Sequence, residues 1–460
     1  MAKPQYLGPR LRRLRRDLGL TQAQMATDLE VSASYVALIE RNQRPLTAEL
    51  LLRLASTYEV DLARFAGDGG AGTAARLDEV LRDPIFGGLD LAPGEAAEVA
   101  GASPGVAEGL LRVYTAYKEA QLVAADRGGP AERDPLAELR AFLGARRNHF
   151  PVLDEQAERL AGRVAAAGGL DPYLKARHGL DVRHLPSDVM NGAVRRMDLH
   201  RRAVLLDDGL DGAGARFQVA LQLSYLEFGD ALEAGLSEAR FETAQARPLA
   251  RRALANYAAG AVVMPYARFY KEAEGRAYDI EALCRRFGAS FEQTAHRLTT
   301  LQRPGAQGVP FFFIRVDAAG NVSKRLDGGG APFARHGGSC PLWALHDAFA
   351  RRREIVTQLA ELPDGERFFT VARTVTAGGG GHDAPRVVRA VGLGCAASEA
   401  HRLCYARGLD AAAAPATPIG VTCRLCQRAG CVARAEPPIG RAILADDYRR
   451  MAAPFGLTDA

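Results

Sequence analysis

Two hydrophobic patterns follow one another along the 460-residue chain. Near the N-terminus, apolar residues recur every three or four positions, as at Leu11, Leu14 and Leu18, and this spacing predicts amphipathic helices. Helical patterns continue to about residue 301, interrupted by two short strand-like pieces at 179–185 and 203–207. From residue 309 onward, runs rich in Phe, Val and Ile lie between glycine clusters, which is typical of β-strands. We therefore expect a multidomain protein whose N-terminal and middle parts are mainly helical and whose C-terminal part contains a sheet.

The first seventy residues predict two short helices joined by a tight turn. Thr21 is placed to cap a helix that turns Met25 and Leu29 inward, and Ser32 is placed to cap the next helix. In a helix-turn-helix, the second of these helices lies in the major groove of DNA. We expect base-edge contacts from Ser32, Ala33, Ser34 and Tyr35, and phosphate or flanking contacts from Gln22, Arg41, Asn42 and Arg44. A small helical bundle that touches no DNA is the alternative.

Charge and composition refine this prediction. The formal net charge is +5, and Arg10–Arg16 places five arginines in seven residues, which suits either a phosphate contact or a solvated helix face. A hydrophobic fraction of 48% and a charged fraction of 25% are ordinary for a soluble protein. Neither a signal peptide nor a membrane span is predicted, so we expect a cytoplasmic protein with reduced thiols.

The segment RFQVALQLSYLEFG predicts a helix in the middle of the chain. Residues from about His149 to Pro265 resemble the zincin-like domain of the ImmA/IrrE family, whose functional members carry His-Glu-x-x-His on this helix. By this resemblance, Leu221 and Tyr225 stand where zinc-binding histidines are expected, and Gln222 stands where the general base is expected. The downstream acidic ligand is replaced by Arg251, Arg252 and Leu254. We therefore expect no catalytic residues and no enzymatic activity; a metallopeptidase is the least favoured alternative.

Two further segments, at 255–270 and 285–325, and the C-terminal region resemble the short-chain fatty acyl transcriptional regulators. These are Xre-type helix-turn-helix regulators of acetate and propionate metabolism. The resemblance implies double-stranded DNA as a partner, a short-chain acyl-CoA as effector, and a homodimer or higher homo-oligomer. It gives four segments: a helix-turn-helix domain (1–68), a helical connector (69–148), a degenerate ImmA/IrrE-like domain (149–307), and an α+β sensor domain with a cysteine cluster (308–460).

Three thiols lie within nine residues, at Cys423, Cys426 and Cys431. The C-x2-C spacing can bring two sulfurs onto one metal, and all-thiolate ligation suits zinc or an iron–sulfur cluster. As the fourth ligand we prefer Cys395, which follows a glycine-rich strand end, over Cys340 and Cys404. The family resemblance implies a [4Fe–4S] cluster; zinc, or thiols without metal, are the alternatives.

An acyl-CoA site requires cations near an apolar or aromatic slot. Arg315, Lys324 and Arg325 lie close in sequence to three consecutive phenylalanines and to Trp343, and we expect the acyl-CoA in this neighbourhood. A tryptophan in such a context is more often a core residue, which is the alternative for Trp343. A redox or iron–sulfur-sensing repressor without acyl-CoA input is the alternative function.

Overall fold

The structure is a computed structural model. It describes residues 8–17, 20–41, 43–58, 71–86, 89, 94–127, 134–237, 239–328, 340–378, 382, 385–439, 441–444, 448 and 451–457. Contacts divide the chain near residue 121 into two compact units. Unit 1 is the N-terminal part and unit 2 is the remainder. Among the described helices, none combines the length and apolar character that a membrane span requires.

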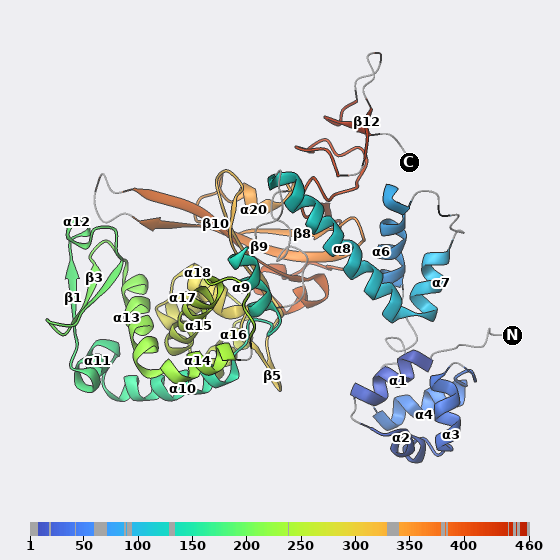
Figure 1. Ribbon diagram of the computed structural model, residues 1–460, viewed down its shortest axis with the longest axis horizontal. Coiled ribbons are helices and arrows are strands. Elements are labelled where there is room, and N and C mark those ends of the chain that lie inside the picture. The colour runs from blue at the N-terminus through green and yellow to red at the C-terminus, as the bar shows by residue number, and fades with distance from the viewer. Residues whose placement is uncertain are drawn as a thin grey trace. The chain divides into compact units, whose positions relative to one another are not determined.

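The N-terminal part of unit 1 is a small helical domain, drawn in dark blue in Figure 1. It consists of α1 (Gly8–Asp17), α2 (Gln22–Asp28), α3 (Ala33–Glu40) and α4 (Ala48–Tyr58). Thr21 and Gln24 form a capping box at the start of α2, and the Ser32 hydroxyl accepts from the Tyr35 N–H at the start of α3. Both caps agree with the sequence analysis, because capping depends on residues only three positions apart.

A buried carboxylate fixes the first three helices of this domain. Glu40, on α3, accepts from Arg15 Nε at 2.6 Å and from Gln22 Nε2 at 2.7 Å. Burial alone would raise the pKa of Glu40, but these two donors offset it and the pKa is lowered. Arg15 therefore serves the packing of α1 against α3, although it belongs to the arginine run for which the sequence allows either a phosphate contact or a solvated helix face.

The rest of unit 1 is helical. It contains α6 (Ala71–Leu81), the short η1 (Pro84–Phe86), α7 (Glu95–Ala102) and α8 (Pro104–Arg127). Asp83 is buried and pairs with Lys118 Nζ at 2.7 Å. It also accepts from the Tyr114 hydroxyl at 2.7 Å, so that one carboxylate joins η1 to α8.

Unit 2 begins with a helical region around a three-stranded sheet. Its elements are α9 (Pro135–Gly144), α10 (Pro151–Ala166), α11 (Leu170–His178), β1 (Asp181–Leu185), α12 (Ser187–Met190), β2 (Arg195–Asp198), β3 (Ala203–Asp207), α13 (Gly212–Glu227), α14 (Gly229–Ser237), α15 (Ala246–Val263), α16 (Tyr266–Gly275), α17 (Ile280–Phe287) and α18 (Phe291–Leu298). β3 lies in the middle of the sheet, parallel to β1 and antiparallel to β2. The alanine-rich α15 is central and packs against α9, α10, α13 and α14.

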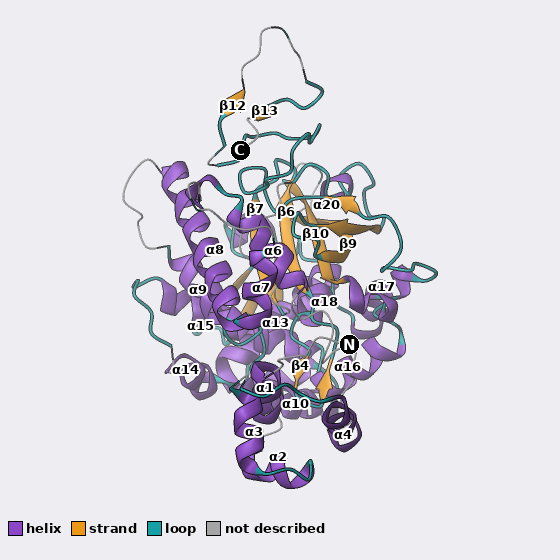
Figure 2. Ribbon diagram, turned by 90° about the vertical axis from the view of Figure 1, so that its right-hand side faces the viewer, coloured by secondary structure: helices purple, strands orange, loops and turns teal. Residues whose placement is uncertain are grey.

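A six-stranded sheet follows, with strand order β11-β8-β9-β10-β6-β7. Its long central strands lie side by side in Figure 2. The elements are β4 (Gln302–Arg303), β5 (Ala306–Gln307), β6 (Phe312–Asp317), β7 (Val322–Asp327), α20 (Ala344–Asp347), β8 (Val356–Glu361), β9 (Arg367–Gly378), β10 (Arg386–Ala396), η2 (Ala397–Arg402), η3 (Cys404–Ala406), β11 (Thr417–Pro418), β12 (Ile443–Leu444) and β13 (Gly456–Leu457). The expected fold class, helical first and sheet-containing last, is confirmed.

The two faces of this sheet belong to different hydrophobic cores. Phe313, Phe369 and Leu393 face the helices of the middle region and join the core around α15. Their neighbours Phe312 and Phe368 point the other way and form a second core with Trp343, Leu345 and Ile419. The first core contains residues from both sides of position 307, so segments 149–307 and 308–460 pack together as one unit.

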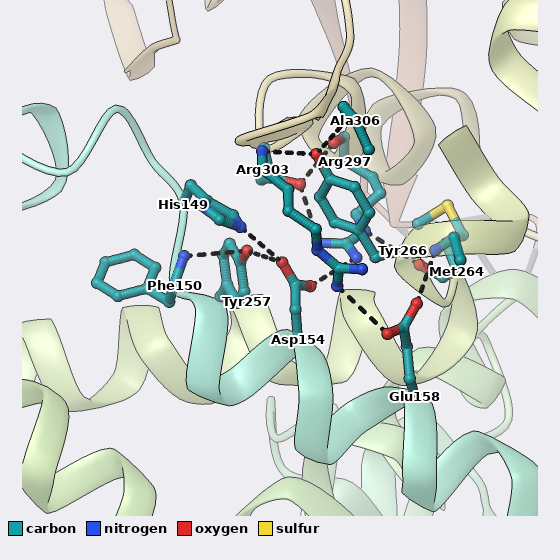
Figure 3. Close-up of polar contacts among 12 residues, drawn as sticks. His149, Phe150, Asp154, Glu158, Tyr257, Met264, Tyr266, Arg297, Arg303 and Ala306 are labelled. Carbon is teal, nitrogen blue, oxygen red and sulfur yellow. Dashed lines mark hydrogen bonds and ion pairs between the residues drawn. The ribbon is translucent and has the colours of Figure 1, made fainter. Parts of the chain in front are cut away.

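A buried ion pair lies at the centre of unit 2 (Figure 3). Asp154, on α10, accepts from Arg297 Nη2, on α18, at 2.7 Å and from the Tyr257 hydroxyl, on α15, at 2.7 Å. Arg297 also donates to the Met264 carbonyl and the Thr300 hydroxyl, and neither member of the pair is more than 2% exposed at its side chain. Burial alone would raise the pKa of Asp154, but Arg297, His149 and Tyr257 outweigh it and the pKa is lowered.

Removal of this carboxylate should destabilise unit 2 strongly. In Asp154→Asn the Arg297 guanidinium stays buried without its counter-charge, so we expect a loss of about 3–5 kcal/mol in the free energy of unfolding. Urea denaturation followed by tryptophan fluorescence measures this, because the chain's single tryptophan, Trp343, lies in unit 2. Since the folded-state pKa of Asp154 is lowered, its contribution is present at neutral pH and is lost as the pH falls below about 4.

The matched control is Glu155→Gln on the same helix, where the carboxylate is exposed and 3.9 Å from Arg159. This change should alter stability by less than about 1 kcal/mol. Equal denaturation midpoints for Asp154→Asn and Glu155→Gln would contradict the central role of the buried pair.

Candidate functional site

The start of α3 presents a small polar surface. Ala33 and Ser34 are exposed, whereas Tyr35 is half-buried against the domain core. The Ser32 hydroxyl accepts from the Tyr35 N–H at 3.1 Å and lies 3.0 Å from the Ser34 hydroxyl, so it is engaged in capping. Small exposed side chains at a helix N-terminus allow close approach to base edges in a major groove.

The residues that we expect to contact DNA phosphates differ in their exposure and in their contacts within the protein. Arg41 and Arg44 are exposed, and neither forms an ion pair within the described part of the chain. Gln22 is half-buried and its amide donates to Glu40, which leaves it tied to the domain interior. Asn42 lies outside the described residues.

Arginines surround the position of the lost zincin site on α13. Arg195 Nη1 donates to Gln222 Oε1 at 2.7 Å, and the Arg195 and Arg251 guanidiniums lie 5.4 and 5.5 Å from the centre of the Tyr225 ring. Burial lowers the pKa of Arg195. Leu221 is buried and offers no lone pair. A divalent cation would therefore meet guanidiniums here instead of ligands.

A cavity of about 670 Å³ opens between α9, α15, α18 and the β6–β7 hairpin of unit 2. We call it the arginine-rich cavity. Arg315, Lys324 and Arg325, three residues expected at the acyl-CoA site, line it. Among the described lining residues, six side chains are cationic and one, Glu292, is a carboxylate. The cations are Arg140, Arg252, Arg297, Arg315, Lys324 and Arg325. Its positive charge would attract a polyanion.

The electrostatics of this cavity are uneven. Arg315 donates to Glu292 Oε1 at 2.7 Å, and the charge of Arg297 is offset by Asp154. Burial, and then the charge of Arg140, lowers the pKa of Arg325 to about 10. Burial, with a smaller contribution from Arg315, also lowers the pKa of Lys324, which lies 3.5 Å from His296 Nδ1. Arg325 and Lys324 are thus partly desolvated cations that an incoming anion would stabilise.

Trp343 does not reach this cavity. It is buried on the opposite face of the sheet, where its indole N–H lies 3.3 Å from the Thr370 hydroxyl. The expectation that placed it near the acyl-CoA followed nearness in sequence, whereas Trp343 precedes α20, which packs on the face of the sheet that carries Phe312 and Phe368. Conversely, Arg140 and Arg252 line the cavity and were not predicted, because they lie on helices remote in sequence.

The three clustered cysteines lie in a loop after β11. Cys423 and Cys426 are buried and Cys431 is half-buried. The guanidinium of Arg434 is buried among them and donates to the carbonyls of Cys423 and Cys426 at 3.0 and 3.1 Å. Within the described residues, no group of three or more His, Cys, Asp or Glu side chains is arranged to hold a metal ion.

Cys340, and not Cys395, accompanies this loop. The Gly420 N–H donates to Cys340 Sγ at 3.4 Å, and a Cβ at Gly420 would lie only 2.8 Å from Cys426 Sγ. Burial raises the pKa of Cys340, and the thiols of Cys423 and Cys426 raise it further. Cys340 is therefore the fourth thiol of this neighbourhood.

Our expected fourth ligand, Cys395, lies elsewhere. It is on β10, three strands from β11, and its side chain joins the core on the opposite face from Cys340. Burial raises its pKa to about 12. The strand spacing of about 4.8 Å alone separates β10 from β11 by some 14 Å. The choice of Cys395 rested on the close backbone approach that Gly392 and Gly394 would allow, and the structure places its side chain in the core on the face opposite Cys340.

Comparisons with known proteins match these regions in order. A helix-turn-helix domain model matches residues 7–66, an IrrE N-terminal-like domain model matches 175–299, and the model described as "Short-chain fatty acyl coenzyme A regulator, C-terminal" matches 300–455. The chain is 39% identical to the HTH-type transcriptional regulator RamB of Mycobacterium tuberculosis, over 98% of both chains. It is 38% identical to the Propionyl-CoA carboxylase regulator of Cereibacter sphaeroides, over the full length of both.

A solved structure of a Mycobacterium tuberculosis transcriptional regulator is also similar. It shares 38% sequence identity with a TM-score of 0.66, and the match covers 70% of this chain and 99% of that one. Identity of this degree over nearly entire chains leaves one assignment. The chain belongs to the short-chain fatty acyl coenzyme A regulator family and is a DNA-binding transcription regulator of the RamB type.

Proposed function

We propose that this regulator senses a short-chain acyl-CoA in the arginine-rich cavity and adjusts its affinity for DNA in response. The observation that carries the proposal is the excess of cationic over carboxylate side chains around one 670 Å³ space. Coenzyme A carries several phosphate charges, and such ligands are bound by converging Arg and Lys side chains. The relative named as a propionyl-CoA carboxylase regulator supports the choice of ligand class.

The walls of the cavity suit both ends of such a ligand. Lys324, Arg325, Arg140 and Arg252 provide donors for phosphates. Apolar side chains of α9 and α15, together with Phe217, offer surface for a short acyl group; they include Leu136, Leu139, Leu143 and Leu249. A polar rim with an apolar wall is the usual composition of a cofactor-sized site.

Helix α9 offers a route from ligand to DNA-binding domain. It lines the cavity through Leu136 and Arg140, and it is the first helix after α8, which begins in unit 1. A ligand that binds two placements of α9 with different affinity shifts the balance between them. We propose that a cytoplasmic homodimer presents two α3 helices to DNA half-sites. The distance between these two helices would then depend on which placement of α9 is populated.

For the cysteine loop we propose a [4Fe–4S] cluster held by Cys340, Cys423, Cys426 and Cys431, with zinc as the alternative. The donor set is all thiol, and the neighbouring Arg434 guanidinium is 4% exposed without a carboxylate partner among the described residues. A buried cation requires a counter-charge, and thiolates would supply it. The bound group would cross-link the segment at Cys340 to the loop after β11.

Arg44→Ala should weaken DNA binding without changing sequence preference. We expect affinity for the chain's own upstream DNA and for scrambled DNA to fall by a similar factor, because phosphate contacts do not read sequence. The slope of log affinity against log salt should decrease by about 0.9, the contribution of one phosphate. Fluorescence anisotropy over a series of salt concentrations measures both quantities.

The control for this variant is Arg53→Ala on α4. Arg53 is paired with Glu30 and Glu49 at 2.9 and 3.0 Å, so its loss should leave the salt slope unchanged. An unchanged slope in Arg44→Ala would remove Arg44 from the DNA interface.

Arg325→Met should impair the response to acyl-CoA. We would titrate acetyl-, propionyl- and butyryl-CoA into the protein–DNA complex at fixed salt, with free CoA as a comparison. One acyl-CoA should shift DNA affinity several-fold in the unmodified protein, and Arg325→Met should need on the order of tenfold more of it, because a charged hydrogen bond is lost. Arg286→Met, an exposed α17 residue paired with Glu272, is the control. If the protein binds DNA specifically and no acyl-CoA changes the affinity, the result would favour a regulator controlled by its cysteines alone.

Cysteine variants distinguish the two candidate ligand sets. In protein purified without oxygen, Cys340→Ser and Cys426→Ser should lose the visible absorbance of an iron–sulfur cluster, whereas Cys395→Ser should keep it. Metal analysis and circular dichroism would accompany each spectrum to identify zinc or misfolding. Retention of absorbance in Cys340→Ser, with its loss in a folded Cys395→Ser, would restore Cys395 as the ligand.

A further inference from the structure

A second cavity, of about 730 Å³, lies in the middle region of unit 2 between α10, β3, α13 and the end of α15. It shares no lining residue with the arginine-rich cavity among the described residues, and it does not include Leu221, Gln222 or Tyr225. Neither the lost zincin site nor the proposed acyl-CoA site therefore accounts for it. We call it the valine-floored cavity.

One side of this cavity is apolar. Val164, Val219 and Val262 line it with Leu206, and each of these side chains is at most 9% exposed. They come from α10, α13, α15 and β3, so the surface is part of the packed core and is not a mobile rim. An aliphatic chain laid on it would be removed from water, which is favourable by roughly 0.8 kcal/mol per methylene.

The polar side of the cavity carries two arginines, Arg216 and Arg268, that are both held by Phe287. Arg216 Nη1 donates to the Phe287 carbonyl at 2.5 Å, and the Arg268 guanidinium lies 5.3 Å from the centre of the Phe287 ring. Both arginines are exposed at the mouth of the cavity, and the charge of Arg268 is felt at Arg216. Burial, and then the charge of Arg268, lowers the pKa of Arg216.

No carboxylate forms an ion pair with either arginine within the described residues. Neither Arg216 nor Arg268 forms an ion pair there, in contrast to Arg247 and Arg251, which both pair with Glu233. An anion that accepts from both guanidiniums would offset their mutual repulsion. The cavity thus joins an anion-binding end to an apolar floor.

The composition of the lining limits the size and charge of the ligand. Besides the two arginines, the described charged lining residue is Asp171, so the net lining charge is +1 with His184 neutral, against +5 for the arginine-rich cavity. No Phe, Tyr or Trp is among the described lining residues, so an adenine ring would find no stacking partner. A polyphosphate or nucleotide is therefore disfavoured relative to a monoanion with an aliphatic chain.

We propose that the valine-floored cavity is a second ligand site, which binds an aliphatic monocarboxylate. The carboxylate lies between Arg216 and Arg268, and the chain extends over Val164, Val219 and Val262. The protein would then bind a free acid at one site and, by the proposed function, a thioester at another. The acid site stands on its own observations and does not depend on the thioester site.

Isothermal titration calorimetry on the full chain tests the proposal with sodium salts from acetate to octanoate, at constant ionic strength set with sodium chloride. Affinity should rise about fourfold per added methylene until the floor is covered. Arg216→Met combined with Arg268→Met should weaken octanoate binding by on the order of tenfold or more, since two charged hydrogen bonds are lost. Arg177→Met, an exposed α11 residue outside the lining, should leave binding unchanged.

A second variant distinguishes the loss of the site from misfolding of the double mutant. Ala165→Phe places a ring in the cavity from an exposed position on α10 and should block octanoate while circular dichroism stays unchanged. Three results would overturn the proposal: no binding heat with any acid, equal binding of phosphate and octanoate, or octanoate binding that survives both variants. Loss of octanoate binding in Arg252→Met instead would place the acid in the arginine-rich cavity. None of these results bears on the response to acyl-CoA, which is tested separately through Arg325.

Discussion

The buried pair of Asp154 and Arg297 is the constraint on which unit 2 depends. It joins α10 to α18, and through Tyr257 it also fixes α15, the helix against which α9, α10, α13 and α14 pack. A charge buried to this extent is tolerated only when its partner is held in place, so the three helices have little freedom to slide. Arg297 and Tyr257 also line the arginine-rich cavity, whose shape is therefore set by the same interaction.

The two faces of the six-stranded sheet support different candidate sites in the C-terminal region. One face packs on the helices of the middle region and carries Arg315 and Lys324 to the arginine-rich cavity. The other face supports Trp343 and Cys340, next to the loop that bears the three clustered cysteines. Because successive strand residues point to opposite faces, neighbouring residues serve different sites, as Phe312 and Phe313 do.

Arginine replaces metal-binding chemistry in the middle region. Where a zincin would gather histidines and a carboxylate, this chain gathers Arg195, Arg251 and the Tyr225 ring. Elsewhere in the same region arginines converge on two cavities, and two of them, Arg297 and Arg315, pair with carboxylates. The backbone of such a fold sets where side chains converge and the residue types set their charge, so the same arrangement of helices can present cations to an anion.

The sequence by itself determined what depends on near neighbours. The caps of α2 and α3, the strands β1, β3 and β6, the helix α13 and the nearness of Cys423, Cys426 and Cys431 in one loop could all be predicted, because each involves residues a few positions apart. Only the tertiary structure decided which distant residues meet. It brought Arg140 and Arg252 to the arginine-rich cavity, placed Cys340 rather than Cys395 beside the cysteine loop, and placed Trp343 on the other face. Strand order and facing depend on non-local pairing, in which one residue of register reverses every side chain, and no local pattern encodes that choice.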